Sequence, residues 1–316
     1  MADPTVSYER WIEAAGIALA SGDHSNAERA LRAAIQATEG LEDSYLERAT
    51  ALIKLGTLKL EMANHAEAEG FFRNALEINE RALGSENLGL VPALKGLGTT
   101  RVLRGMAQEA EPLLARALAI SERHLGADHP DLVILLNDLT RLYLKQSAHA
   151  FAEPLLLRLL EMKRSKGEDH PEVATVLASL AAVRQALGRH EAAEQLWRRV
   201  LSIRERTLAP NHFAIATAVE HLAETCSARG KVREALQLFQ RALTIRESTL
   251  GKDHASLRNS RERIADLELQ ASEESFDSGD SHPTPAEPAR RLTDEELGLT
   301  IAVATGREKS VIAPMR

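Results

Sequence analysis

The sequence predicts an all-α protein built as a solenoid of antiparallel helix pairs. Two observations carry this prediction: an internal repeat of 41 or 42 residues, and a composition with 44% apolar but only 3% aromatic residues. Alanine and leucine must therefore fill the core, which favours helices over a β-sandwich.

The repeat is visible at three kinds of position that recur along the chain. The first is an anchor alanine, usually followed by glutamate, which occurs at Ala27, Ala68, Ala110, Ala152, Ala193 and Ala235. The second is a small residue, named here the small anchor, which occurs at Ala15, Gly56, Gly98, Thr140, Ala181 and Ala223. The third closes each unit and occurs at Gly84, Gly126, Gly167, Ala209 and Gly251. Successive members of the first two sets are 41, 42, 42, 41 and 42 residues apart, so they share one period.

Each unit contains two helical patterns. In the sixth unit Val232, Leu236 and Phe239 recur at the spacing of one helix face. Gly188 and Gly230 stand between the two patterns of their units, where the end of a helix often needs a residue with positive φ. Because a single helix pair cannot bury its apolar face alone, neighbouring pairs are expected to stack into one core.

The junctions between units carry start signals for the next helix. In the segment Asp169-His170-Pro171 we expect the aspartate to cap the helix and the proline to occupy its first turn. Six helix pairs are predicted over residues 7–251.

A capping helix and a tail are predicted after the sixth pair. Residues 255–270 align with the first helix of a seventh unit but place Ser260 and Arg261 at apolar positions, as a terminal helix with a polar outer face requires. We therefore expect residues 1–270 to form the solenoid and residues 271–316 to be a disordered acidic tail rich in proline and serine. Within the tail, residues 293–305 combine a capping box with a short apolar run, and are either a nascent turn or a docking segment.

These repeats resemble a known family, the tetratricopeptide repeat proteins. Trp11, Ala15, Gly22 and Ala27 fall at the spacing of that family's pattern in the first unit. The long unit, the Ala-Glu-Pro-Leu segment that occurs twice and the Leu-Gly-x-Asp-His-Pro junction are similar to those of kinesin light chains and many bacterial proteins. The resemblance implies a right-handed superhelix in which the first helix of each pair lines a concave groove.

No residue pattern indicates catalysis, a cofactor or a metal site. Eight of the eleven histidines occupy repeat positions, where we expect them to cap and pack helices: His24, His65, His129, His149, His170, His190, His212 and His254. The single cysteine, Cys226, lies at an apolar repeat position and is expected to be a buried, inert thiol. We therefore expect a protein that is not an enzyme.

Charge and hydropathy restrict the class of partner. Acidic residues exceed basic ones by 46 − 39 = 7, and the pI is about 5.9, which argues against a nucleic-acid-binding protein. No apolar run approaches the length of about 18 residues that a membrane helix needs. One cysteine excludes an intrachain disulfide. We expect a cytoplasmic protein without a membrane or nucleic-acid partner.

The resemblance also implies which side chains face the groove, from their spacing to the small anchor. The candidate peptide-binding residues are Lys95, Thr99, Asn137, Arg141, Lys145, Glu220 and Glu224. Cations on adjacent helices bind carboxylates, and an asparagine amide can hydrogen-bond a peptide backbone. Alternatively, these charges only solvate a helix face.

The leading interpretation is an interaction scaffold that binds a peptide or helical segment, such as an acidic one, of a partner protein. A second hypothesis is a signalling-peptide or tail-gated receptor, in which residues 294–296 fold into the groove and block it. Truncation after Gln270 would then raise the affinity for the partner. A third is an accessory module of a larger multidomain enzyme. Self-association through the ends of the solenoid is also compatible with the sequence.

Overall fold

The computed structural model describes residues 4–41 and 44–277, which form thirteen α-helices and two short 3₁₀-helices with no β-strand. The elements are α1 (Pro4–Ala20), α2 (His24–Ala37), α3 (Tyr45–Glu61), α4 (His65–Leu83), η1 (Leu88–Leu90), α5 (Val91–Leu103), α6 (Ala107–Leu125), α7 (Leu132–Lys145), α8 (His149–Arg164), α9 (Pro171–Ala186), α10 (His190–Thr207), α11 (Phe213–Ala228), α12 (Val232–Leu250), η2 (Ala255–Leu257) and α13 (Arg258–Asp277). The prediction of an all-α protein built from consecutive packed helix pairs is confirmed. None of the described helices has both the length and the apolar content needed to cross a membrane.

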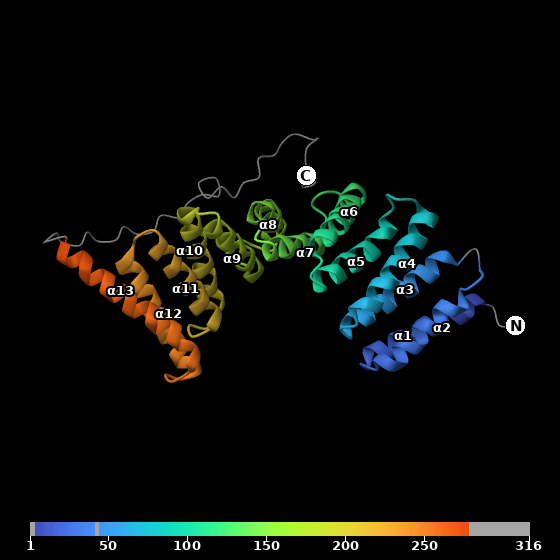
Figure 1. The fold of residues 1–316 in the computed structure, drawn as a ribbon, viewed down its shortest axis with the longest axis horizontal. Coiled ribbons are helices and arrows are strands. Elements are labelled where there is room, and N and C mark those ends of the chain that lie inside the picture. The colour runs from blue at the N-terminus through green and yellow to red at the C-terminus, as the bar shows by residue number, and fades with distance from the viewer. Residues whose placement is uncertain (1–3, 42–43, 278–316) are drawn as a thin grey trace. The chain divides into compact units, whose positions relative to one another are not determined.

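The helices belong to two compact units, of which the first ends at Gln146 and the second begins at Ser147. In the first unit, α1 packs on α2, α3 on α4 and α5 on α6, and each second helix also contacts the first helix of the next repeat (Figure 1). The second unit has the same organisation in α9 with α10 and α11 with α12. The fourth repeat contributes α7 to the first unit and α8 to the second.

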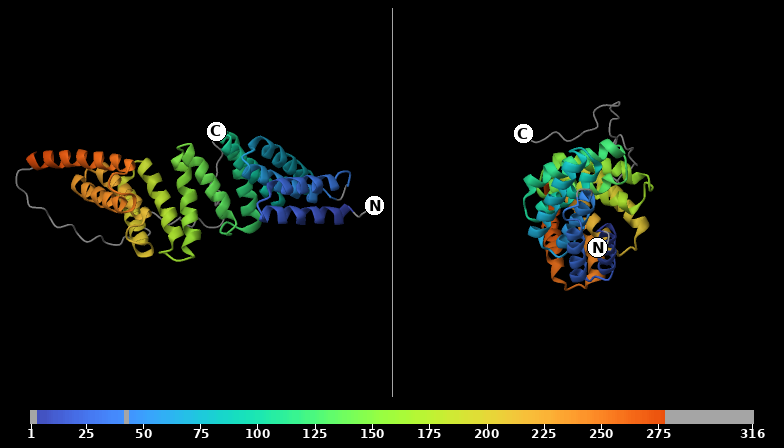
Figure 2. Two further views of the ribbon diagram at one scale, coloured as in Figure 1. Left: turned by 90° about the horizontal axis from the view of Figure 1, so that it is seen from below. Right: turned by 90° about the vertical axis from the view of Figure 1, so that its right-hand side faces the viewer.

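The array ends in a single helix, α13, which packs on α12 (Figure 2). Together with η2 it occupies the segment predicted as a capping helix, residues 255–270. The helix continues to Asp277, past the point where the tail was expected to begin. The rest of the tail, including residues 293–305, lies outside the described residues.

Turns and caps follow the repeat, with one correction. Gly188 and Gly230 have φ of +75° and +74°, as predicted for the turn between paired helices. The prediction that Asp169 caps the first helix of the fifth repeat is wrong: His170 Nδ1 accepts a hydrogen bond from the Glu172 amide at 3.2 Å. Asp169 pairs with Arg206 at 2.6 Å instead. His170 therefore caps this helix, which is one of the roles expected for the histidines at repeat positions.

Small anchors let the helices approach closely. A Cβ atom added to Gly98 would lie 2.8 Å from the Leu114 side chain, and one added to Gly56 would lie 3.0 Å from the Phe72 ring. The anchors Ala181 and Ala223 are fully buried. The contact is tightest at Gly96, where a Cβ atom would lie 2.3 Å from the Phe72 ring.

The substitution Gly96→Ala is therefore expected to destabilise the first unit. The Phe72 ring is buried and overlaps the position of the added methyl group, so the ring and its neighbours must shift, and overpacking of this kind costs about 1–3 kcal/mol. Thermal or urea unfolding followed by circular dichroism measures the change.

The matched control is Gly70→Ala, in the middle of α4, where an added Cβ atom meets nothing within 4 Å. Alanine is favoured over glycine in a helix by about 1 kcal/mol, so this variant should unfold at a higher temperature than the wild type. Equal effects of the two substitutions would contradict close packing at Gly96.

A buried polar contact, named here the inter-repeat ladder, links successive repeats. Its acidic members follow the anchor alanine: Glu28, Glu69, Glu111, Glu153 and Glu194. The facing position, three residues after the next small anchor, is occupied by Lys59, Arg101, Tyr143, Arg184 and Cys226. Lys59 Nζ lies 2.7 Å from Glu28 Oε1, and Arg184 Nε lies 3.1 Å from Glu153 Oε1. The Tyr143 hydroxyl donates to Glu111 over 3.0 Å.

The last member of the ladder is built differently, because Cys226 cannot pair with Glu194. Lys231 Nζ lies 2.8 Å from Glu194 Oε1, Arg198 Nη2 also lies 2.8 Å from it, and Arg229 pairs with the other oxygen. Although burial raises the pKa of Glu194, the hydrogen bonds from Lys231, Arg198 and Arg229 outweigh it and lower the pKa to about 2. The ionised carboxylate is therefore strongly held in the folded state.

This lowered pKa predicts a pH-dependent effect of Glu194→Gln. A shift from 4.5 to about 2 corresponds to about 3 kcal/mol of stabilisation, present above pH 5 and lost as the pH falls towards 2. The variant should therefore unfold at lower urea than the wild type at pH 7, with the difference shrinking by pH 3. The exposed Glu161→Gln in the same unit serves as the control and should change the midpoint little at either pH. A pH-independent difference for Glu194→Gln would contradict the ladder's electrostatic role.

Candidate functional site

Five of the seven predicted groove residues lie on two neighbouring helices of the first unit. Helix α5 carries two of them and packs against α7, which carries the other three. We name this surface the basic wall, defined by Lys95, Thr99, Asn137, Arg141 and Lys145. Asn137, Arg141 and Lys145 are exposed and follow one another at four-residue spacing, so they share one face of α7. Lys95 and Thr99 are half-buried.

The cations of the basic wall differ in how they are partnered. Within the described part of the chain, neither Lys95 nor Lys145 has an ion pair. Arg141 Nη2 lies 2.6 Å from Asp138 Oδ1 on the same helix. The wall therefore offers two unpaired ammonium groups and one guanidinium that already has a carboxylate partner.

Sequence reasoning missed the role of Asp138 in this surface. Its side chain is only 15% exposed, whereas that of Arg141 is 59% exposed. Burial raises the pKa of Asp138, and the nearby charges of Arg141 and Lys95 act in the opposite direction. The Asn-Asp pair before the small anchor was visible in the sequence, but nothing in the repeat shows which neighbour a polar side chain contacts.

Two large apolar side chains on α5 and α7 are exposed. Ile134, one turn before Asn137, is 55% exposed, and Leu103, one turn after Thr99, is 51% exposed. Both follow the face of the wall residues on their helices. The surface therefore combines positive charge and an amide with apolar area that a ligand could bury.

The remaining two candidates, Glu220 and Glu224, lie on α11 in the second unit and form a separate surface. Glu220 pairs with Arg246 and accepts a hydrogen bond from the Ser260 hydroxyl, and burial raises its pKa. Glu224 Oε2 lies 3.0 Å from His221 Nδ1, and this hydrogen bond lowers the pKa of Glu224. Both carboxylates already have protein partners.

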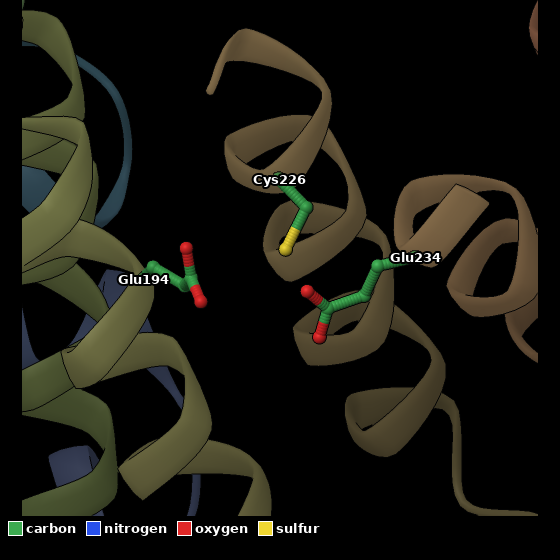
Figure 3. A group of neighbouring side chains, drawn as sticks. All are labelled: Glu194, Cys226 and Glu234. Carbon is green, nitrogen blue, oxygen red and sulfur yellow. The ribbon is translucent and has the colours of Figure 1, made fainter. Parts of the chain in front are cut away.

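One cluster of side chains has the composition of a metal site. Glu194, Cys226 and Glu234 point towards one another, with ligand atoms that all lie within 4.8 Å (Figure 3). Arg198 and Lys231, however, pair with both carboxylates. Burial and the two carboxylates raise the pKa of the Cys226 thiol to about 12, whereas metal binding needs the thiolate. The cluster is an ion-pair network that does not fit a cation.

A scan against protein families identifies the repeat. The tetratricopeptide repeat model matches residues 47–123, 90–165, 149–206, 172–248 and 214–275. No curated protein matches the sequence.

Solved structures with a similar fold include kinesin-light-chain-like proteins. A structure of nearly identical TPR-like repeats of a putative kinesin light chain from Podosopora anserina is 24% identical, covers 66% of this chain and 99% of that chain, and has a TM-score of 0.57. BtubC (BKLC) from P. vanneervenii is 18% identical over 89% of this chain and 98% of that chain, with a TM-score of 0.55. YrrB, a TPR protein with an unusual peptide-binding site, is 20% identical over 75% and 96%, with a TM-score of 0.50.

At these identities the likeness concerns the fold alone. The family model, in contrast, matches overlapping segments that together cover residues 47–275, which is most of the chain. The chain therefore belongs to the tetratricopeptide repeat family.

Proposed function

We propose that this chain is a non-catalytic interaction scaffold whose basic wall binds a carboxylate-bearing peptide or helical segment of a partner protein. The observation that carries the proposal is the pair of cations without ion pairs, Lys95 and Lys145, on two helices that pack together. Members of the tetratricopeptide repeat family generally mediate protein–protein interaction, which is consistent with a binding role. The peptide-binding site named for YrrB shows that the fold can present one.

The chemistry of the wall favours a peptide over a small molecule. Ammonium groups on adjacent helices attract carboxylates, and the exposed Asn137 amide can both donate to and accept from a peptide backbone. Ile134 and Leu103 add exposed apolar area, from which a bound segment gains affinity. Charge on the surface then sets orientation and association rate.

The non-catalytic part of the proposal is supported by how the reactive side chains are used. Cys226 is buried with a raised pKa, and Glu194 is held by cations. The junction histidines accept hydrogen bonds from helix amides, as His170 and His212 do. These side chains stabilise the packed repeats, so the candidate function is assigned to the exposed surface.

The proposal predicts that Lys95→Glu with Lys145→Glu strongly weakens binding of an acidic peptide. The double charge reversal replaces attraction by repulsion at both ends of the wall, and a loss of about 30- to 100-fold in affinity is expected. Fluorescence anisotropy with a labelled peptide of alternating glutamate and leucine measures it, and circular dichroism confirms that helicity is retained.

The matched control reverses two exposed arginines of the first unit that lie on second helices, Arg29→Glu and Arg81→Glu. It makes the same change in net charge away from the wall, so affinity should stay within about threefold of the wild type. Equal losses in the two double variants would mean that net charge rather than the wall attracts the peptide, and would refute the proposal.

A further inference from the structure

We propose that Asp138 is a specificity-determining residue of the basic wall: its carboxylate already pairs with Arg141 and competes with an anionic group of the partner for that guanidinium. This inference rests on the proposed function and concerns the same surface. It identifies the preferred partner as a segment with two adjacent anionic groups.

The geometry makes Asp138 a competitor for Arg141. The Asp138 carboxylate is largely buried, so the helix fixes its position, whereas the Arg141 side chain is mostly exposed. Only one terminal nitrogen of the guanidinium contacts Asp138 Oδ1, at 2.6 Å. A guanidinium has five N–H donors in a planar fork, so the other donors of Arg141 remain open to an incoming anion.

The balance of charges around Asp138 makes the competition sensitive to the ligand. Among the described residues, the charges that act on this carboxylate are Lys95 from α5 and Arg141 from α7, with none from α6. An anion that draws Arg141 or Lys95 towards itself leaves the buried Asp138 carboxylate with less positive charge beside it. The pKa of Asp138 then rises further, so binding is coupled to proton uptake and strengthens as the pH falls.

This competition selects between partner chemistries. A single carboxylate at Arg141 replaces one carboxylate partner by another and gains little. Two adjacent anionic groups can contact Arg141 and Lys145 together, because these residues lie one helical turn apart on α7. The second contact is to an ammonium group that has no ion pair in the described chain, so it adds attraction without displacing anything.

Peptides that carry cysteic acid test the inference, because a sulfonate stays ionised between pH 5 and 7. Asp138→Asn should bind a peptide with two adjacent cysteic acids about three- to tenfold more tightly than the wild type at pH 7. Asp138→Glu keeps the charge and should bind like the wild type. From pH 7 to pH 5 the affinity of the wild type should rise, and that of Asp138→Asn should rise less, since the histidines are common to both.

Two further arms separate this inference from the proposed function. In an Arg141→Ala background the gain from Asp138→Asn should disappear, because there is no guanidinium left to release. If the peptide binds the wild type but Asp138→Asn neither tightens binding nor alters its pH dependence, the competitor role is overturned while the basic wall stands. If the peptide does not bind the wild type and binds none of the variants, both proposals fail. Thermal unfolding of each variant verifies that the comparison is between folded proteins.

Discussion

Contact between the second helix of one repeat and the first helix of the next is the constraint on which both units depend. A helix pair of this size leaves its apolar face half covered, so each repeat is stable only against a neighbour. The Phe72 ring shows how closely the contact is fitted, since it fills the space that two glycines, Gly56 and Gly96, leave open. Residues at this contact are therefore unavailable for function.

The inter-repeat ladder adds specificity to that apolar contact. A buried ion pair contributes little net stability compared with apolar packing, but removal of one partner leaves an unpaired buried charge, which is costly. Pairs such as Glu28 with Lys59 and Glu153 with Arg184 therefore favour one alignment of neighbouring repeats over shifted ones. Where Cys226 interrupts the pattern, the turn after α11 supplies Lys231 in compensation, which keeps Glu194 ionised.

The sequence predicted the fold well, because the residue types that recur in every repeat are those at buried positions. It predicted side-chain partners poorly because these depend on geometry that no period encodes. Asp169 and His170 are adjacent, yet the histidine caps the helix and the aspartate pairs with Arg206. Ala63 and Ser147 take positive φ of 58° and 56° at the turn where the other four repeats have glycine. The period also continues unbroken past Gln146, so nothing in it marks the division into two units.

At the candidate site the positions of Lys95 and Arg141 followed from the register, whereas the pairing of Arg141 with Asp138 did not.

One repeat position, two residues before the small anchor, explains how closely packed repeats can carry a variable surface. It holds Gly96 in the third repeat, Asp138 in the fourth and His221 in the sixth. Gly96 makes room for Phe72, and His221 stacks on Trp197 with ring centroids 4.8 Å apart, each 24 residues after the aromatic side chain that it meets. The position thus lies where the core borders the exposed face of the first helix, so the fold tolerates a glycine, a stacked ring or a half-buried carboxylate there. A carboxylate at such a border is fixed by the core but can still exchange partners with the surface, which is the property that makes Asp138 suited to tune the basic wall.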